Sequence, residues 1–194
     1  MNGYEKRTKA KKDSIINAAW ELFSERGITD VGISEIASKA KVSQVSIYNY
    51  FGNKSTLAKE VLISYLDKAI KGYDEILEKE IPFSKKLKLI MDQKYEATAE
   101  LSSSAFSKYA WEDKTLQQVY KEAVNSKAIS VYNKFIELGK KEGAIDTNIP
   151  TEAILAYLIS SVSIIEQSDY LKTSQEYKTG ILKLFFYGIL GKVK

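Results

Sequence analysis

The chain has 194 residues and a net charge of +4 at pH 7, and it contains neither cysteine nor histidine. This composition excludes disulfides, thiolate or imidazole metal sites, and acid–base catalysis by histidine. Only two prolines and ten glycines interrupt spacers rich in good helix formers, which predicts an all-α fold.

Motifs of catalysis are missing from the sequence. There is no P-loop, no GxGxxG and no paired-carboxylate motif, so we expect no enzyme, no cofactor and no metal site. An enzyme built on a carboxylate or a lysine is the alternative that composition leaves open. The charged N-terminus lacks the apolar core of a secretion signal, so we expect a cytoplasmic protein. The apolar run 153–165 is interrupted by serines and too short to cross a bilayer, so we expect no membrane partner.

Positive charge is concentrated in residues 1–12, which we call the basic arm. Five cations there face one carboxylate, Glu5, and this imbalance equals the net charge of +4 of the whole chain. The cations are Lys6, Arg7, Lys9, Lys11 and Lys12. A solvated, frayed terminus explains such a run, and so does a helical adaptor on anionic lipid, although the arm has no apolar face to insert. The next segment favours a phosphate backbone instead.

Three helices are predicted after the arm. Apolar residues at helical spacing from Asp13 to Arg26 indicate the first helix, which Gly27 ends. A second, short helix follows Gly32, which acts as its N-cap in a weak capping box with Glu35. A tight turn at 41–43 leads to the third helix, and two short helices joined this way form a helix-turn-helix.

The third helix, Gln44–Tyr50, has two predicted faces. Ile47 and Phe51 are four residues apart and point toward the first two helices. Ser43 is expected to cap this helix by accepting the Ser46 amide, and Asn53 to cap the next helix. The outer surface carries polar groups and tyrosine but no carboxylate, which suits a surface that faces DNA phosphates.

The run Ile15–Leu57 closely resembles the DNA-binding signature of the tetracycline-repressor (TetR) family. The resemblance rests on pairs such as Ala18-Ala19, Leu22-Phe23 and Ile47-Tyr48 and on single residues such as Gly27 and Lys54. It implies a DNA-binding domain of three helices at 1–53 and a larger helical domain for ligand binding and dimerisation at 54–194. The whole chain then has about nine helices.

Position by position, the resemblance implies two kinds of contact with double-stranded operator DNA. The residues that match phosphate contacts are Ser43, Tyr48, Tyr50 and Lys54, and those that match the major-groove surface are Gln44, Val45, Ser46 and Asn49. Gln44 is the best base reader, because a carboxamide pairs with adenine in bidentate fashion. Three residues depart from the family pattern: Gly32 replaces a common threonine cap, and Lys41 and Val45 replace common glycines. A left-handed backbone at Lys41 would strain a side chain there.

Six further helical segments are predicted: 54–79, 84–101, 103–111, 115–142, 151–169 and 174–190. The middle segments hold residues that are candidates for an apolar ligand pocket, or alternatively for a plain aromatic core. They are Met91, Tyr95, Phe106, Tyr109, Trp111, Tyr120, Tyr132 and Phe135.

The last two helical segments are apolar over more than one face, which indicates a partner beyond the chain's own core. The resemblance implies that they form a four-helix interface in a homodimer. The candidate interface residues are Leu158, Val162, Ile165, Ile181, Leu184 and Phe185. We expect a repressor that a small molecule releases from its operator. The alternative is a regulator of the same fold without an effector, which acts by position or through a protein partner.

Overall fold

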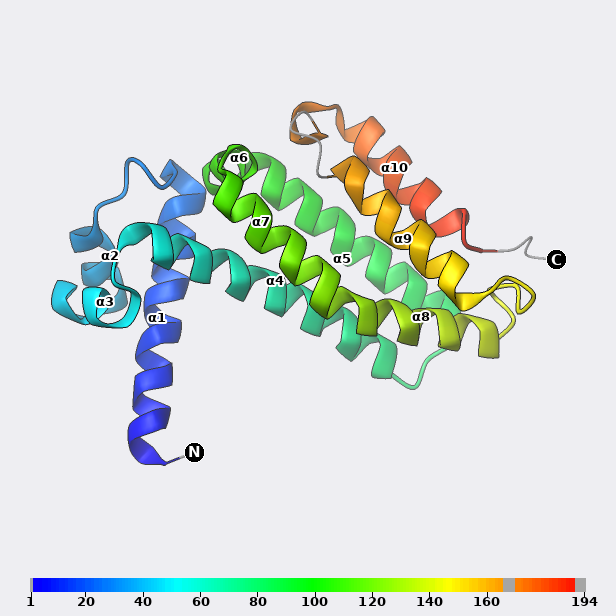
Figure 1. Cartoon of the computed structure of the whole chain (residues 1–194), viewed down its shortest axis with the longest axis horizontal. Helices are drawn as coiled ribbons and strands as arrows, with labels where there is room; N and C mark the ends of the chain where they lie inside the picture. The colour runs from blue at the N-terminus through cyan, green and yellow to red at the C-terminus, as the bar shows by residue number, and fades with distance from the viewer. Residues whose placement is uncertain (1, 166–169, 191–194) are drawn as a thin grey trace. The chain divides into compact units, whose positions relative to one another are not determined.

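The computed structural model describes residues 2–165 and 170–190, without the side chains of Val124, Asn125, Val162, Ser163, Ile165 and Leu171. All regular structure in these residues is helical, which confirms the all-α prediction (Figure 1). The α-helices are α1 (Gly3–Arg26), α2 (Ile33–Ala40), α3 (Gln44–Phe51), α4 (Lys54–Glu78), α5 (Phe83–Ser103), α6 (Ala105–Glu112), α7 (Lys114–Ala123), α8 (Ile129–Lys141), α9 (Thr151–Ile165) and α10 (Gln175–Tyr187).

One predicted helix contains a local irregularity. The predicted segment 115–142 is α7 and α8 with a π-helical stretch, Val124–Ala128, between them. The chain runs through this stretch without leaving a helical course, because Ala123 and Ile129 on either side have right-handed helical backbone angles. Taken as one helix, this segment gives nine helices in the described part of the chain, as expected.

The chain forms two compact units. The first unit contains the described residues up to Asp67 together with Ser103–Tyr120, and the second contains Lys68–Ser102 and the described residues from Lys121 onward. Helix α4 therefore contributes residues to both. The predicted boundary between Asn53 and Lys54 separates a DNA-binding segment from a ligand-binding segment, whereas the two units are defined by compactness. The functional boundary therefore stays a prediction.

The core of the first unit forms around α1. Ile15, Ala19 and Phe23 on one face of α1 are fully buried. Phe23 stacks on Phe106 of α6 with ring centroids 5.9 Å apart, and Trp20 meets the same ring edge-on at 5.7 Å. These contacts bury large aromatic surface, which is the main favourable term in holding α1 and α6 together.

Helix α1 begins ten residues earlier than predicted, so the basic arm is helical. Asn2 Oδ1 accepts the Glu5 amide and Glu5 Oε2 accepts the Asn2 amide, both at 2.9 Å. This reciprocal pair satisfies two amides that a helix start otherwise leaves free. Glu5 also places negative charge at the positive end of the helix dipole.

The second unit packs its helices around Phe83, Phe135 and Phe186. The rings of Phe83 and Phe135 are 5.0 Å apart, and those of Phe135 and Phe186 are 6.3 Å apart. Ile136 and Leu158 are almost completely buried in the same cluster. Within the described residues, no helix combines the length and the hydropathy that crossing a bilayer requires.

Candidate nucleic-acid interface

Helices α2 and α3 form the predicted helix-turn-helix, and their ends are fixed by local hydrogen bonds. Gly32 lacks a capping side chain, but its amide donates to Glu35 Oε1 at 2.9 Å, so half of the expected capping box forms. Arg26 pairs with the other oxygen of Glu35. The Gly32 amide and the Arg26 guanidinium together lower the pKa of Glu35.

The turn between the helices contains a strained residue. Lys41 has φ 55° and ψ 44°, the left-handed conformation, and it is the one non-glycine residue with positive φ in the described part of the chain. The Val42 amide then donates to the Ala37 carbonyl at 3.0 Å and closes the end of α2. Lysine therefore occupies a left-handed position that glycine adopts at a lower cost in conformational free energy.

Ser43 caps α3 as predicted. Its hydroxyl oxygen accepts the Ser46 amide at 3.1 Å, and the two serine hydroxyls are 2.9 Å apart. Ile47 and Phe51 are 1% and 6% exposed, so they anchor α3 to the rest of the first unit.

The opposite face of α3 is presented to solvent. Val45 is 65% exposed and Tyr48 is 51% exposed, and Gln44 and Asn49 are exposed beside them. Ser46 is half-buried, and its hydroxyl lies against that of Ser43. The structure therefore brings the predicted base-reading residues together on one exposed, carboxylate-free face, which we call the α3 face.

The basic arm meets α3 at Tyr50. Lys12 Nζ lies 5.7 Å from the centroid of the Tyr50 ring, within the range of a cation–π contact. Lys6, Arg7, Lys9 and Lys11 are exposed on the arm. Sequence reasoning identified the charge of the arm but not this contact, because a frayed and a helical arm have the same composition.

Lys54 differs from its predicted role. Its ammonium donates to the carbonyls of Ile28 at 2.7 Å, Val31 at 3.0 Å and Thr29 at 3.4 Å. An ammonium has three donor hydrogens, so these contacts occupy it within the protein. In this structure Lys54 orders the loop before α2 rather than facing outward as a phosphate contact. Asn53 does cap α4 as predicted, since its Oδ1 accepts the Thr56 amide at 2.8 Å.

The helix-turn-helix also carries the match to known proteins. Residues 15–61 match the model of the family described as "Bacterial regulatory proteins, tetR family". The HTH-type transcriptional repressor KstR2 of Rhodococcus jostii is 26% identical over 152 residues, which cover 76% of this chain and 74% of that repressor. The match to the tetR family thus covers α2, α3 and the adjoining parts of α1 and α4. The HTH-type regulator YvdT of Bacillus subtilis is 39% identical over 71 residues, a match of 36% of its length.

Solved structures show that the likeness extends over both units. The transcriptional regulator of Cytophaga hutchinsonii covers 91% of this chain with a TM-score of 0.71 at 20% identity. FadR of Bacillus subtilis, solved in complex with stearoyl-CoA, covers 91% with a TM-score of 0.62 at 19% identity. At these identities the likeness shows the fold. Together with the family match, it establishes an all-α transcriptional regulator with an N-terminal helix-turn-helix, whose relatives are regulators rather than enzymes.

The predicted pocket residues of the first unit belong to its packing. Phe106 is 1% exposed in the core, and the rings of Trp111 and Tyr120 lie 5.3 Å apart. Tyr109 is 38% exposed and its hydroxyl reaches Asp113 at 3.5 Å. The burial of Phe106 fits the alternative interpretation, a plain aromatic core, whereas Tyr109 lies at the surface.

The predicted pocket residues of the second unit have varied surroundings. Phe135 is buried in the core, with Met91 and Tyr132 packed against the same cluster. Burial raises the pKa of Tyr132 to about 12. Tyr95, by contrast, is 43% exposed. The pocket candidates thus divide between the two units, and their role as a ligand pocket stays a prediction.

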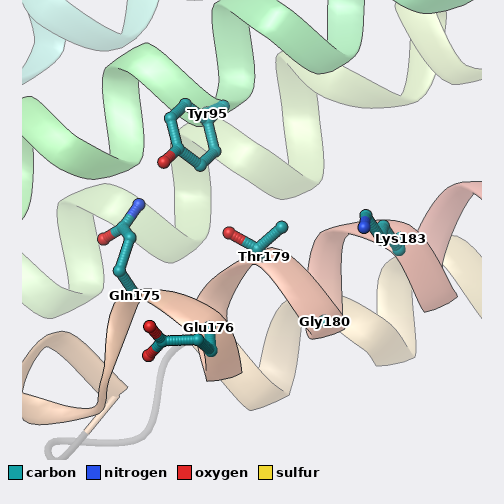
Figure 2. A pocket seen from close by; sticks show the side chains of 6 residues that line it. All are labelled: Tyr95, Gln175, Glu176, Thr179, Gly180 and Lys183. Atoms are coloured by element: carbon teal, nitrogen blue, oxygen red, sulfur yellow. The ribbon is translucent and has the colours of Figure 1, made fainter.

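Tyr95 borders a hollow of about 360 Å³ on the second unit (Figure 2). Its other lining residues come from the first turns of α10, and they are Gln175, Glu176, Thr179, Gly180 and Lys183. The Tyr95 ring on α5 faces these side chains across the hollow. A lining of carboxamide, carboxylate, hydroxyl and ammonium groups is polar, unlike the apolar pocket that the sequence predicts.

The predicted dimer residues fall into three groups. Leu184 on α10 is 66% exposed and Ile181 is half-buried, so both reach the surface. Leu158 and Phe185 are 1% and 6% exposed in the core of the second unit, which corrects their prediction as interface residues. The side chains of Val162 and Ile165 lie outside the described residues.

Two exposed tyrosines beside Leu184 were not predicted. Tyr157 on α9 is 41% exposed, and its hydroxyl donates to the Leu184 carbonyl at 3.2 Å. Tyr187 on α10 is 57% exposed. The prediction rests on runs of leucine, valine and isoleucine. Tyrosine adds little to such a run, so the sequence pattern does not indicate these two residues. Interfaces are nevertheless enriched in tyrosine.

Proposed function

We propose that this protein is a homodimeric repressor that binds operator DNA through the α3 face and is released by a small apolar or amphipathic ligand. Residues 1–53 supply the DNA-binding domain and residues 54–194 the domain for ligand binding and dimerisation. The observation that carries the proposal is the α3 face itself. Exposed side chains without a carboxylate, on a short helix fixed by the Ser43 cap and by buried Ile47 and Phe51, suit a major groove.

The residues of the α3 face divide by chemistry into readers and positioners. Gln44 and Asn49 offer carboxamides to base edges, and Val45 offers an apolar patch to a thymine methyl group. Ser43, Tyr48 and Tyr50 offer hydroxyls to phosphates, which fix register without carrying sequence information. Lys54 supports this surface through the loop it orders.

The basic arm adds sequence-independent affinity. Its exposed cations release counterions when they approach phosphates, so binding weakens steeply with salt. Lys12 lies against Tyr50, which places the end of the arm beside the α3 face. The arm therefore extends the electrostatic footprint beyond the helix-turn-helix.

Two solved relatives in fold support a small-molecule effector. FadR of Bacillus subtilis was solved with stearoyl-CoA, and SmeT, which has a TM-score of 0.63 and 12% identity to this chain, was solved with triclosan. Stearoyl-CoA is amphipathic, and triclosan is a small, mainly apolar molecule. Release from DNA requires that such a ligand bind the DNA-bound and released conformations with different affinity.

The decisive experiment measures base reading by Gln44. Fluorescence anisotropy compares wild type and Gln44→Ala on DNA from the protein's own upstream region and on random-sequence DNA. We expect a loss of roughly tenfold on the upstream fragment, since a bidentate contact is worth about 1–3 kcal/mol, and little loss on random DNA. Gln118→Ala, an exposed glutamine on α7, is the matched control. Equal losses on both DNAs would refute base reading, and wild type that prefers no fragment would refute the function.

The second candidate is a regulator of the same fold without a small-molecule effector. The polar lining of the hollow at Tyr95 favours it, because a drug-like apolar ligand needs an apolar site. A thermal-shift screen separates the two candidates, because a ligand that binds the native state raises the melting temperature. Stabilisation together with release of DNA supports the effector, and stabilisation without release supports the second candidate.

A further inference from the structure

Two buried lysines of the second unit have oxygen partners. Lys86 is 6% exposed and donates to the Leu77 carbonyl at 2.6 Å. Lys178 is 4% exposed and donates to the Ser102 hydroxyl at 3.0 Å. Hydrogen bonds of this kind compensate an ammonium for the water that it loses.

Lys94, on α5, is half-buried and has aromatic neighbours instead. Its Nζ lies 5.1 Å from the ring centroid of Phe185 on α10 and 5.5 Å from that of Tyr73 on α4. Part of its side chain is exposed to solvent. Among the described residues no oxygen acceptor is seen for this ammonium.

The electrostatic surroundings of Lys94 also lack a counter-charge. Burial lowers the pKa of Lys94 to about 8, and no charged neighbour contributes to that shift. The aromatic groups in cation–π range of it are the Tyr73 ring from α4, which is titratable, and the Phe185 ring from α10. Asp74, next along α4, pairs with Lys134 at 2.8 Å.

We propose that Lys94 binds the anionic group, a carboxylate, of an amphipathic effector whose apolar body packs beside Phe185 and Tyr73. This inference rests on the proposed function and names its ligand class. A carboxylate supplies the oxygen acceptor and the counter-charge that the ammonium lacks. The two aromatic rings lower the local dielectric beside the ammonium, which strengthens such a pair. A cationic amphiphile is repelled at the same place.

The test compares three probes that share a ten-carbon chain and differ in their head group. Isothermal titration calorimetry measures binding of decanoate, decanol and decyltrimethylammonium to the full-length protein at pH 6.5, each below its critical micelle concentration. We expect decanoate to bind at least tenfold more tightly than either other probe. Lys94→Met keeps the length and apolar stem of the side chain and should abolish this preference. Lys88→Met, at an exposed lysine of the same helix, should keep it.

Protonation provides a second measurement. Since the pKa of free Lys94 is about 8, decanoate affinity in wild type should fall by up to tenfold per pH unit above 8. It should stay flat in Lys94→Met. Binding of decanoate by Lys94→Met as tightly as by wild type, or no preference for the carboxylate in wild type, would overturn the inference.

DNA binding, followed by anisotropy in the same samples, separates this inference from the proposed function. If the protein binds its upstream fragment but shows no carboxylate preference, the inference fails and the repressor remains. If decanoate binds through Lys94 but no DNA fragment is preferred, the anion site stands and the proposed function fails.

Discussion

The backbone of Lys41 is strained in the turn of the helix-turn-helix. Its left-handed backbone closes α2 and lets Val42 bond back to Ala37. For a residue with a Cβ, this conformation costs roughly 1–2 kcal/mol, and glycine avoids most of that cost. The turn survives because the buried faces of α2 and α3 hold it in place.

Lys41→Gly should therefore stabilise the protein. We expect a gain of about 1 kcal/mol in the free energy of unfolding, measured by chemical denaturation, because glycine relieves the strain at φ 55°. Lys39→Gly, inside α2, is the control and should lose about 1 kcal/mol instead. A loss of stability in Lys41→Gly would show that the lysine side chain holds the turn by a contact of its own.

Lys54 has a structural role that stability measurements can isolate. Lys54→Met removes the donor that the carbonyls of Ile28 and Val31 share, at 2.7 and 3.0 Å. Hydrogen bonds to a charged group contribute about 1.5–3 kcal/mol, so we expect a loss of that order in denaturation. Lys59→Met, on the same helix, should change little. Unchanged stability combined with a weaker salt dependence of DNA binding would favour the phosphate contact that the sequence predicts.

At the scale of elements, the sequence predicts helix ends well where a cap marks them. Ser43 and Asn53 both accept amides as expected, and α3 and α4 begin where predicted. The sequence does not predict the start of α1, because a run of charges has no hydrophobic period and the cap, Asn2, lies eleven residues before the predicted start at Asp13. The π-helical stretch at 124–128 was also missed, since it interrupts hydrogen bonding without changing the apolar pattern.

The candidate DNA interface was easier to predict than the pocket for a similar reason. The α3 face depends on which side of a single helix is buried, and spacing alone determines that. The environment of Lys94 depends on α4, α5 and α10 meeting, at residues far apart in the chain. No local pattern marks such a meeting. Nor does one separate Phe185, in the core, from Leu184 on the surface.

The helical arm should contribute to the salt dependence of DNA binding without affecting sequence preference. We replace Lys6, Arg7 and Lys9 together by glutamine, which keeps the helix but removes three charges. The slope of log affinity against log salt should become shallower by about 0.9 for each phosphate that the arm no longer neutralises. Anisotropy titrations from low to high salt measure this slope.

The control variant for the arm removes the same number of positive charges from the second unit. Lys71, Lys79 and Lys85 are exposed there, and replacing all three by glutamine should leave the slope near that of wild type. Equal slopes for the arm variant and wild type would show that the arm stays away from phosphates. A shift in the preferred DNA sequence would show that the arm reads bases.

At the scale of the whole molecule, a helix-turn-helix regulator gains affinity by binding two half-sites at once. Half-sites about 34–36 Å apart, or a multiple of that, require a two-fold dimer. Leu184, Tyr157 and Tyr187 form an exposed apolar set on α9 and α10, which suits a symmetric interface. The core residues Leu158 and Phe185 lie in the same two helices and hold this set in place.

Leu184→Glu should separate the dimer, because a symmetric interface would bury two carboxylates against apolar surface. Light scattering coupled to size exclusion should then report the monomer mass of 21.9 kDa, and wild type twice that. Leu89→Glu, at another exposed leucine of the second unit, should leave the dimer intact.

On a fragment with two half-sites the Leu184 variant should bind roughly 10²-fold more weakly than wild type, because each helix-turn-helix then binds alone. On a single half-site the two proteins should bind alike. A Leu184→Glu protein that keeps twice the monomer mass would place the interface on another surface.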